Sequence, residues 1–282
     1  MQQTVKAFVL ECEVLDNLYS KLNEEDWKRP TQFKQWTPED ILVHLHFWNT
    51  AADLSLQQPA QFARLFVEVA ASMKTEGMRP IENRKVSERG TELLELWRGT
   101  YQQMSAAWSA LDPKTRVKWA GPDMSVRSSI TARQMETWAH GQAVFDLCGQ
   151  QRQETDRLKN IVVLGVNTYE WTYKVRKLTL PGPMPQLILT SPDGEQWTFG
   201  NNRDTDTDTD TQHDELIKGS AVGFAQTVTQ TRNAADTDLI ITGPVATDWM
   251  SKAQCFAGDA VAPPVAGTRF METTGIVVDS PR

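Results

Sequence analysis

Long apolar segments are missing from this chain of 282 residues. No stretch approaches the roughly 20 apolar residues that are needed to span a bilayer. The first twenty residues carry Glu11, Glu13 and Asp16 at positions where a secretion signal would be uninterrupted and apolar. We therefore expect a cytoplasmic protein with no membrane partner.

Cysteine is scarce, and basic residues form no cluster. Cys12, Cys148 and Cys255 are odd in number and far apart, which favours reduced core thiols over a disulfide framework or a cysteine metal site. With 36 acidic residues against 29 basic ones, the formal net charge is −7. Such a chain repels phosphate backbones, so nucleic acid is not an expected partner.

The composition is that of a globular protein with room for about two domains. Hydrophobic residues make up 40% of the chain and charged residues 23%, which excludes disorder for most of it. Apolar residues recur at helical spacing in the N-terminal half, so we expect an α-helical bundle with a connecting helix over residues 1–178. The helices of the bundle are predicted near residues 5–22, 37–56, 62–73, 93–111 and 128–149.

The pattern changes beyond the connecting helix, which we place at residues 156–178 and expect to pack against the bundle. Two β-rich runs flank Pro192-Asp193-Gly194, a sequence typical of a hairpin turn. A helix capped by Ser220, a further strand and a final helix follow, and this alternation predicts a small α+β domain over residues 179–260. Residues 261–282 are expected to form a loosely ordered tail.

One low-complexity segment alternates aspartate and threonine over residues 204–210. Alternating carboxylates occur in calcium-binding loops, but this segment lacks the turn glycine and the final bidentate glutamate of such a loop. We therefore interpret it as a solvated expansion of a loop, with calcium binding as the less favoured alternative.

Two of the four histidines, His44 and His46, lie together in the second predicted helix. Residues two apart on a helix point to nearly opposite sides, so we expect only one of them to face the bundle interior. His44 is in line with Ile41 and Trp48. The pattern therefore predicts that His44, and not His46, faces inward.

In the last predicted helix of the bundle, Glu136 and His140 are four residues apart and lie on one face. With His44 they form two imidazoles and a carboxylate, a set that holds a divalent metal and leaves positions open for water or substrate. A cation would also relieve the cost of burying the carboxylate. The alternative is a surface pair of Glu136 and His140 with His44 as an ordinary core histidine.

Several segments carry a family resemblance. Residues 36–45 resemble the W-T-x-x-D-x-x-x-H-L opening of DinB-like metal-binding bundles. Residues 119–142, which include METWAHGQ, resemble a bacterial branch of the mycothiol-dependent maleylpyruvate isomerase superfamily. The similarity continues through residues 164–166 and 242–244, and it covers the chain from about residue 5 to about residue 258.

This resemblance implies a DinB-like four-helix bundle that binds one divalent metal, followed by a small α+β domain similar to sterol-carrier-like modules. Zinc is the favoured ion, with other first-row divalent ions as alternatives. The ligand triad of the family maps onto His44, Glu136 and His140, the same three residues that the spacing selects. The family usually has an acidic residue directly after His-Gly-Gln, where this chain has Ala143. A proton-relay role at that position is therefore not carried over.

The resemblance further implies a metal-dependent enzyme that activates a low-molecular-weight thiol, such as mycothiol or bacillithiol, for transfer or isomerisation of a small-molecule substrate. A divalent ion stabilises a thiolate and so provides a strong nucleophile at neutral pH. Trp48 and Trp138 are candidate walls of the cofactor site, with core packing as their alternative role. Arg232, beyond the second-domain helix, is a candidate catalytic residue that can pair with a carboxylate or cofactor, with plain surface charge as its alternative.

Two other classes of function remain open. One is a non-catalytic, metal-containing module that binds a small apolar ligand in its α+β domain. The other is metal-assisted hydrolysis, which needs a general base near the metal-bound water, and the sequence offers no further inward histidine or carboxylate for it. Three protein ligands leave the coordination of a metal incomplete, which favours catalysis over a structural ion.

Overall fold

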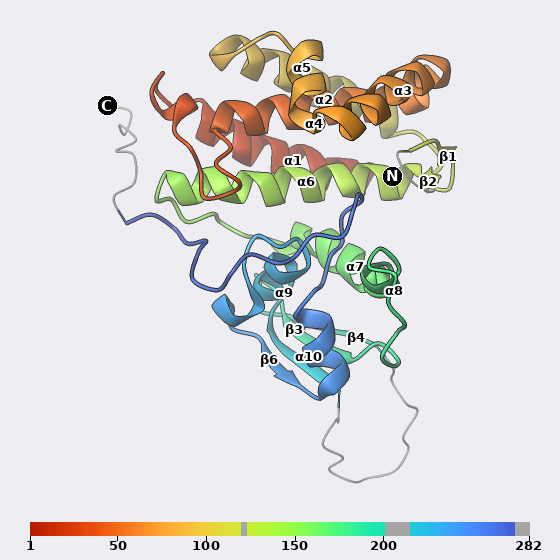
Figure 1. Cartoon of the computed structure of the whole chain (residues 1–282), viewed down its shortest axis with the longest axis vertical. Helices are drawn as coiled ribbons and strands as arrows, with labels where there is room; N and C mark the ends of the chain where they lie inside the picture. Colours follow the sequence, from red (N-terminus) through yellow and green to blue (C-terminus); the bar gives the residue numbers. More distant parts are fainter. Residues whose placement is uncertain (120–122, 201–214, 274–282) are drawn as a thin grey trace. The chain divides into compact units, whose positions relative to one another are not determined.

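The computed structural model describes residues 1–119, 123–200 and 215–273, and it divides the chain into two compact units (Figure 1). The first unit comprises Met1–Gln151 together with the described residues from Met271 onward, and the second comprises Arg152–Phe270. The first unit is helical and the second combines helices with a small sheet. This confirms the predicted combination of a helical N-terminal domain and an α+β domain.

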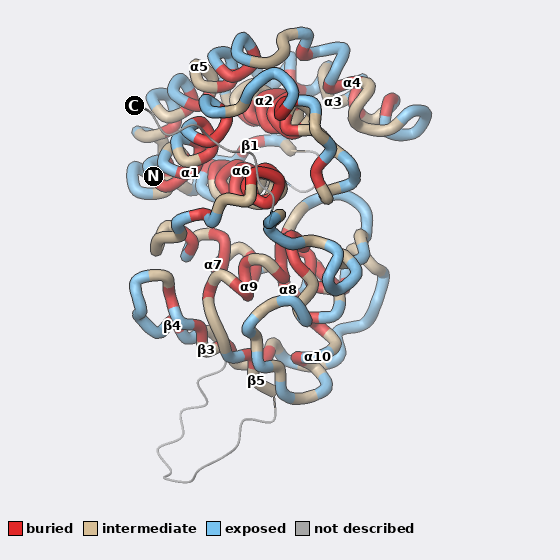
Figure 2. The backbone as a smooth tube through the Cα atoms, turned by 90° about the vertical axis from the view of Figure 1, so that its left-hand side faces the viewer, coloured by how far each residue is buried: buried red, intermediate tan, exposed pale blue. Residues whose placement is uncertain are grey.

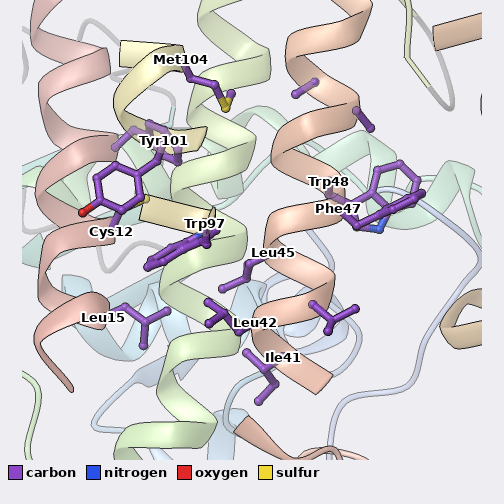
Figure 3. Packing of buried hydrophobic residues seen from close by; sticks show 14 of the residues in the cluster. Cys12, Leu15, Ile41, Leu42, Leu45, Phe47, Trp48, Trp97, Tyr101 and Met104 are labelled. Atoms are coloured by element: carbon purple, nitrogen blue, oxygen red, sulfur yellow. The ribbon is translucent and has the colours of Figure 1, made fainter. Parts of the chain in front are cut away.

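The long helices of the first unit pack pairwise around an apolar core. Helix α1 contacts α5 and α6, and α2 contacts the same two helices. Figure 2 shows buried positions along α2 and α6, and Figure 3 shows core side chains such as Leu15, Leu42 and Trp97 between the helices. The elements of this unit are α1 (Gln2–Tyr19), η1 (Asp26–Lys28), α2 (Pro38–Gln57), α3 (Pro59–Thr75), α4 (Met78–Lys85), α5 (Gly90–Trp108), β1 (Arg116–Val117), β2 (Met124–Ser125) and α6 (Val126–Leu147).

Helix α2 begins where the sequence predicts, because its first turn caps itself. The Thr37 hydroxyl accepts a hydrogen bond from the Asp40 amide at 3.1 Å, and the Asp40 carboxylate accepts one from the Thr37 amide at 3.0 Å. Pro38 occupies the first helical position, where no amide donor is required. This start fixes where His44 lies, two turns into the helix.

Helix α6 begins two to three residues earlier than predicted. The cap is Ser125, whose hydroxyl accepts a hydrogen bond from the Ser128 amide at 3.1 Å. Strand β2 ends at this residue, so the chain passes directly from strand to helix. At the other end Gly149 adopts a φ of 61° and terminates the helix, as predicted.

The second unit contains a four-stranded sheet in the order β4-β3-β5-β6. Strand β3 pairs antiparallel with β4 and parallel with β5, and β5 pairs antiparallel with β6. The predicted hairpin and the helix capped by Ser220 are both present. The elements are η2 (Asp156–Leu158), α7 (Lys159–Asn167), α8 (Tyr169–Lys174), β3 (Gln186–Thr190), β4 (Gln196–Phe199), β5 (Leu216–Ser220), α9 (Ala221–Val228), η3 (Ala234–Asp236), β6 (Ile240–Thr242) and α10 (Pro244–Met250).

The segment at residues 156–178 differs from the single connecting helix that was expected. It forms η2, α7 and α8, and it belongs to the second unit, where α7 packs on α9. The break falls at Thr168, whose hydroxyl donates to the carbonyl oxygens of Leu164 and Gly165 at 2.8 and 3.0 Å. These local bonds compete with continuation of the helix.

The described part of the predicted tail, residues 261–273, contains no helix or strand but is held by hydrogen bonds. Gln230 Nε2 donates to the Val261 carbonyl oxygen at 2.9 Å, and Asn233 Nδ2 donates to that of Pro264 at 2.8 Å. This part is therefore more ordered than the sequence suggests. Residues 274–282 lie outside the described residues, as does the Asp/Thr run at 204–210.

Among the residues that the structure describes, no helix combines the length and apolar character required to cross a membrane.

Candidate metal centre

The three predicted ligands meet in the first unit. His44 projects from α2, and Glu136 and His140 project from α6. The Glu136 Oε2 atom lies 3.1 Å from His140 Nε2 and 3.6 Å from His44 Nε2, and one ligand atom from each residue lies within 4.8 Å of the others. The side chains are 13 to 19% exposed, so the cluster is shielded but reachable.

The charges within the cluster are set by burial and by the partners of each group. Burial raises the pKa of Glu136, but the hydrogen bonds from His140 and His44 outweigh it and hold that pKa well below its usual range. Burial lowers the pKa of His140 despite Glu136, which favours the neutral imidazole. Burial opposes protonation of His44 as well, but Glu82 and Glu136 prevail and raise its pKa to about 9.

The donor set fits a divalent first-row ion. Two imidazole nitrogens and a carboxylate oxygen are ligands that zinc and its neighbours accept, and the ionised Glu136 supplies negative charge to the site. Both imidazoles present Nε2 to Glu136, so both offer the same ring nitrogen to the space that an ion would occupy.

Glu82 is the functional residue that the sequence reasoning missed. It lies on α4, is 1% exposed, and accepts hydrogen bonds at Oε1 from His44 Nδ1 at 2.7 Å and from Trp48 Nε1 at 2.9 Å. A carboxylate in this position places the histidine proton on Nδ1, leaves Nε2 free to bind a metal, and raises the basicity of that nitrogen. Helix α4 is short and polar and contains Pro80, so no apolar stripe reveals it in the sequence.

The His140 ring is positioned differently, by aromatic packing. It stacks on Trp36 with a centroid distance of 5.8 Å and an interplanar angle of 4°, and Phe33 contacts it edge-on at 5.0 Å. Its Nδ1 atom is buried without a hydrogen-bond partner among the described residues. Both imidazoles contact Glu136 and Trp36, but Glu82 fixes only His44, and only His140 stacks face to face on Trp36.

The structure contradicts the prediction that His44 alone, and not His46, faces the interior of the bundle. Its side chain is also buried, at 8% exposure, and Thr100 Oγ1 on α5 lies 3.3 Å from its Nδ1. Burial lowers the pKa of His46 to about 4. Helix α2 is covered by α6 on one side and α5 on another, so both histidines are buried although only His44 joins the cluster.

The remaining predicted site residues lie in different surroundings. Trp48 donates to Glu82 and contacts Trp119 edge-on at 5.6 Å, whereas Trp138 is fully buried in the helical unit. Arg232 is in the second unit, 9% exposed, and its Nη1 donates to the Thr231 carbonyl oxygen at 3.0 Å. Their roles in binding or catalysis stay predictions.

A helical domain with a half-buried His-Glu-His cluster is followed in this chain by a small α+β domain. The sequence matches the model of the mycothiol maleylpyruvate isomerase N-terminal domain over residues 8–145. An uncharacterized protein of Mycobacterium tuberculosis, found in two strains, is 32% identical over 248 residues, covering 88% of this chain and 93% of that protein. The chain therefore belongs to the mycothiol maleylpyruvate isomerase family.

Solved structures agree at the level of the fold. Crystal structures of the mycothiol-dependent maleylpyruvate isomerase and of a histidine-to-alanine mutant of it superpose with TM-scores of 0.52 and 0.53. The alignments cover 85% of this chain and 91% of each of those chains, at 13% and 15% identity. The solved structures thus support the fold, and the match to the family model confirms the family resemblance seen in the sequence.

Proposed function

We propose that this protein is a metal-dependent enzyme that activates a low-molecular-weight thiol for transfer to, or isomerisation of, a small electrophile. The observation that carries the proposal is the cluster of His44, Glu136 and His140, whose ligand atoms lie within 4.8 Å of one another. Membership of a family named for a mycothiol-dependent isomerase supports the choice of a thiol. Zinc is the favoured ion, because it accepts this ligand set and leaves a position open for a substrate.

Each residue around the centre has a separate task. His44, Glu136 and His140 would hold the ion, which when bound supplies Lewis acidity that keeps a thiol in its thiolate form. Glu82 orients His44 through the hydrogen bond to Nδ1. Trp36 stacks on the ring of His140 and makes a T-shaped contact with His44, and it limits the access of water to both rings.

The cysteines of the chain are poor candidates for the nucleophile, which supports an external thiol. All three cysteines are buried. Burial raises the pKa of Cys12 well above its usual value and that of Cys148 to about 12. A thiol with so high a pKa is almost entirely protonated at neutral pH and reacts slowly.

We also infer the finer features that the resemblance implies. The pairwise packing of α1, α2, α5 and α6 supports a DinB-like four-helix bundle. The mixed sheet with α9 packed against β3 and β5 is compatible with a sterol-carrier-like module. Trp48 and Trp138 as cofactor-binding residues and Arg232 as a catalytic residue belong to the same proposal.

The proposal is tested by metal content and response to thiols. Purified wild-type protein is expected to contain about one divalent ion per chain by elemental analysis, and His140→Ala is expected to lose it while keeping its helical circular dichroism. His46→Gln changes a buried histidine outside the cluster and should retain the ion. If no thiol in a panel changes the visible spectrum of the cobalt-substituted protein, the result contradicts thiol activation and favours a non-catalytic module.

A further inference from the structure

Arg133 is a buried cation whose Nε and Nη1 donors have no hydrogen-bond partner among the described residues. It lies on α6, three residues before Glu136, and is 4% exposed. Its Nε and Nη1 atoms are shielded from solvent and have no hydrogen-bond acceptor within the described ranges. Buried polar groups in proteins are nearly always paired, so this side chain requires an explanation.

The contact that Arg133 makes with Trp119 does not use its Nε and Nη1 donors. The guanidinium carbon lies 5.2 Å from the centroid of the Trp119 ring, an interaction that uses the flat face of the cation. The N–H groups project from the edges of the guanidinium plane. Both Nε and Nη1 share an edge with Nη2, and each such edge is a fork that matches the two oxygens of a carboxylate.

The position of Arg133 ties it to the candidate metal centre. Residues 133, 136 and 140 are spaced by three and four along α6 and therefore share one face of the helix. Trp119 also contacts Trp48, which donates to the Glu82 carboxylate that holds His44. A continuous series of contacts through Trp119, Trp48 and Glu82 thus connects Arg133 to His44 of the candidate metal centre.

The positive charge of Arg133 has no counterpart among the described charges around the candidate metal centre, so an anionic ligand would balance it. A divalent cation is balanced by the two carboxylates Glu82 and Glu136, because the imidazoles are neutral when they bind a metal. Arg133 then adds one positive charge that no described residue pairs by a salt bridge. Burial disfavours the charged guanidinium and lowers its pKa, with only the more distant charge of Glu136 opposing the effect.

We propose that Arg133 anchors a carboxylate group of the small molecule on which the metal centre acts. The inference rests on the proposed function for the identity of the neighbouring centre. The ligand class that it adds is a small carboxylic acid, held by one of the guanidinium forks over the face of Trp119.

The experiment measures binding of succinate, a small dicarboxylate probe, by isothermal titration calorimetry to the full chain. We expect wild-type protein to bind succinate in a saturable way and Arg133→Gln to bind it at least tenfold more weakly. Arg127→Gln removes the same charge from an exposed position on the same helix and should bind within twofold of wild type. Succinamide, which has the same shape without the charges, should bind weakly to all three proteins.

Metal content, measured on the same preparations, separates this proposal from the proposed function. If Arg133→Gln binds succinate more weakly than wild type and none of the proteins contains metal, the result supports the role of Arg133 as an anchor and contradicts a metal-dependent enzyme. The anchor is overturned if metal-containing Arg133→Gln and wild type bind succinate with equal affinity. It is also overturned if wild type shows no saturable binding at millimolar succinate.

A second variant covers the case in which Arg133→Gln does not fold. Arg133→Lys keeps the charge and loses the planar fork, so we expect succinate affinity to fall severalfold with metal content unchanged. A lysine variant that binds succinate as tightly as wild type would overturn recognition by the fork.

Discussion

The carboxylate of Glu82 accepts hydrogen bonds from two side chains that lie 38 and 34 residues earlier in the sequence. Because it binds both His44 and Trp48 through Oε1, it fixes the ring nitrogen that His44 presents and also seats a tryptophan beside it. At 1% exposure it has no solvent to replace either partner. Its removal should therefore affect metal affinity and stability together.

Substitution of Glu82 tests this role. Glu82→Gln should weaken metal affinity by roughly 10 to 100-fold, because the amide accepts the His44 hydrogen bond less strongly than the carboxylate. Glu82→Ala should in addition lower the free energy of unfolding by about 1–3 kcal/mol, since the Trp48 indole N–H loses its acceptor. Competition with a chromophoric chelator and urea unfolding measure the two effects, and the exposed Glu95→Gln should change neither.

Cys148 makes stability depend on pH in the alkaline range. Burial raises its pKa from 9.0 to about 12, so above pH 9 the unfolded chain releases the thiol proton while the folded chain keeps it. The free energy of unfolding should therefore decline as the pH rises from 9 toward 12. In urea unfolding at a series of pH values, Cys148→Ala should show a shallower decline, whereas the equally buried Val144→Ala should keep the wild-type slope.

At the scale of elements, the contact between α7 and α9 depends on a residue without a side chain. A Cβ atom at Gly165 would lie 2.8 Å from Val228 Cγ2 and 3.0 Å from Phe224 Cε1. Real Cβ atoms do not approach so closely, so one of the helices would have to move. The glycine thus sets the distance between the two helices.

Alanine substitution at Gly165 measures the strength of this constraint. Gly165→Ala should lower the free energy of unfolding of the second unit by about 1–3 kcal/mol through overpacking. Gly99 offers a matched control on α5, because a Cβ added there meets no atom within 4 Å. Gly99→Ala should stabilise the chain by about 0.4–1 kcal/mol. Denaturant unfolding of both variants is the measurement, and equal destabilisation would contradict the packing argument.

The elements that the sequence predicts are those with strong local signals. Apolar stripes and the Thr37 cap revealed α2, and the hairpin was visible from its turn residues. Helix α4 was not predicted, because it buries little besides Ile81 and Glu82. Strand β5 was also missed, since its partner β3 lies more than twenty residues earlier and the pairing is parallel. Long-range pairings of this kind leave no period in a short window.

Only part of the candidate site was predictable from the sequence. Glu136 and His140 share a helix face by spacing alone, and the inward orientation of His44 follows from its apolar neighbours. The burial of His46 was not predictable, because it depends on α5 covering the other side of α2. Glu82 reaches the site from a separate helix, so only the tertiary structure identifies it.

At the scale of the whole molecule, a bound metal should add stability without creating the fold. The first unit has an extensive apolar core that does not include the cluster, so chelation should leave far-UV circular dichroism nearly unchanged. An ion that binds only the folded state should raise the free energy of unfolding by about 2.7 kcal/mol at 100 times its Kd. The Tm of wild type should thus rise with added zinc, and that of His140→Ala should not. Loss of helicity on chelation would indicate a structural ion instead.

Two indole rings line the imidazoles of the centre. Trp36 stacks on His140 and Trp48 lies 6.4 Å from His44 between ring centroids, among ten tryptophans in the chain. The intrinsic fluorescence of these two tryptophans should therefore report whether an ion occupies the candidate metal centre. Open-shell ions such as Cu²⁺ would quench part of this light at close range, whereas closed-shell Zn²⁺ would not, so the unlabelled protein can report which kind of ion it has captured.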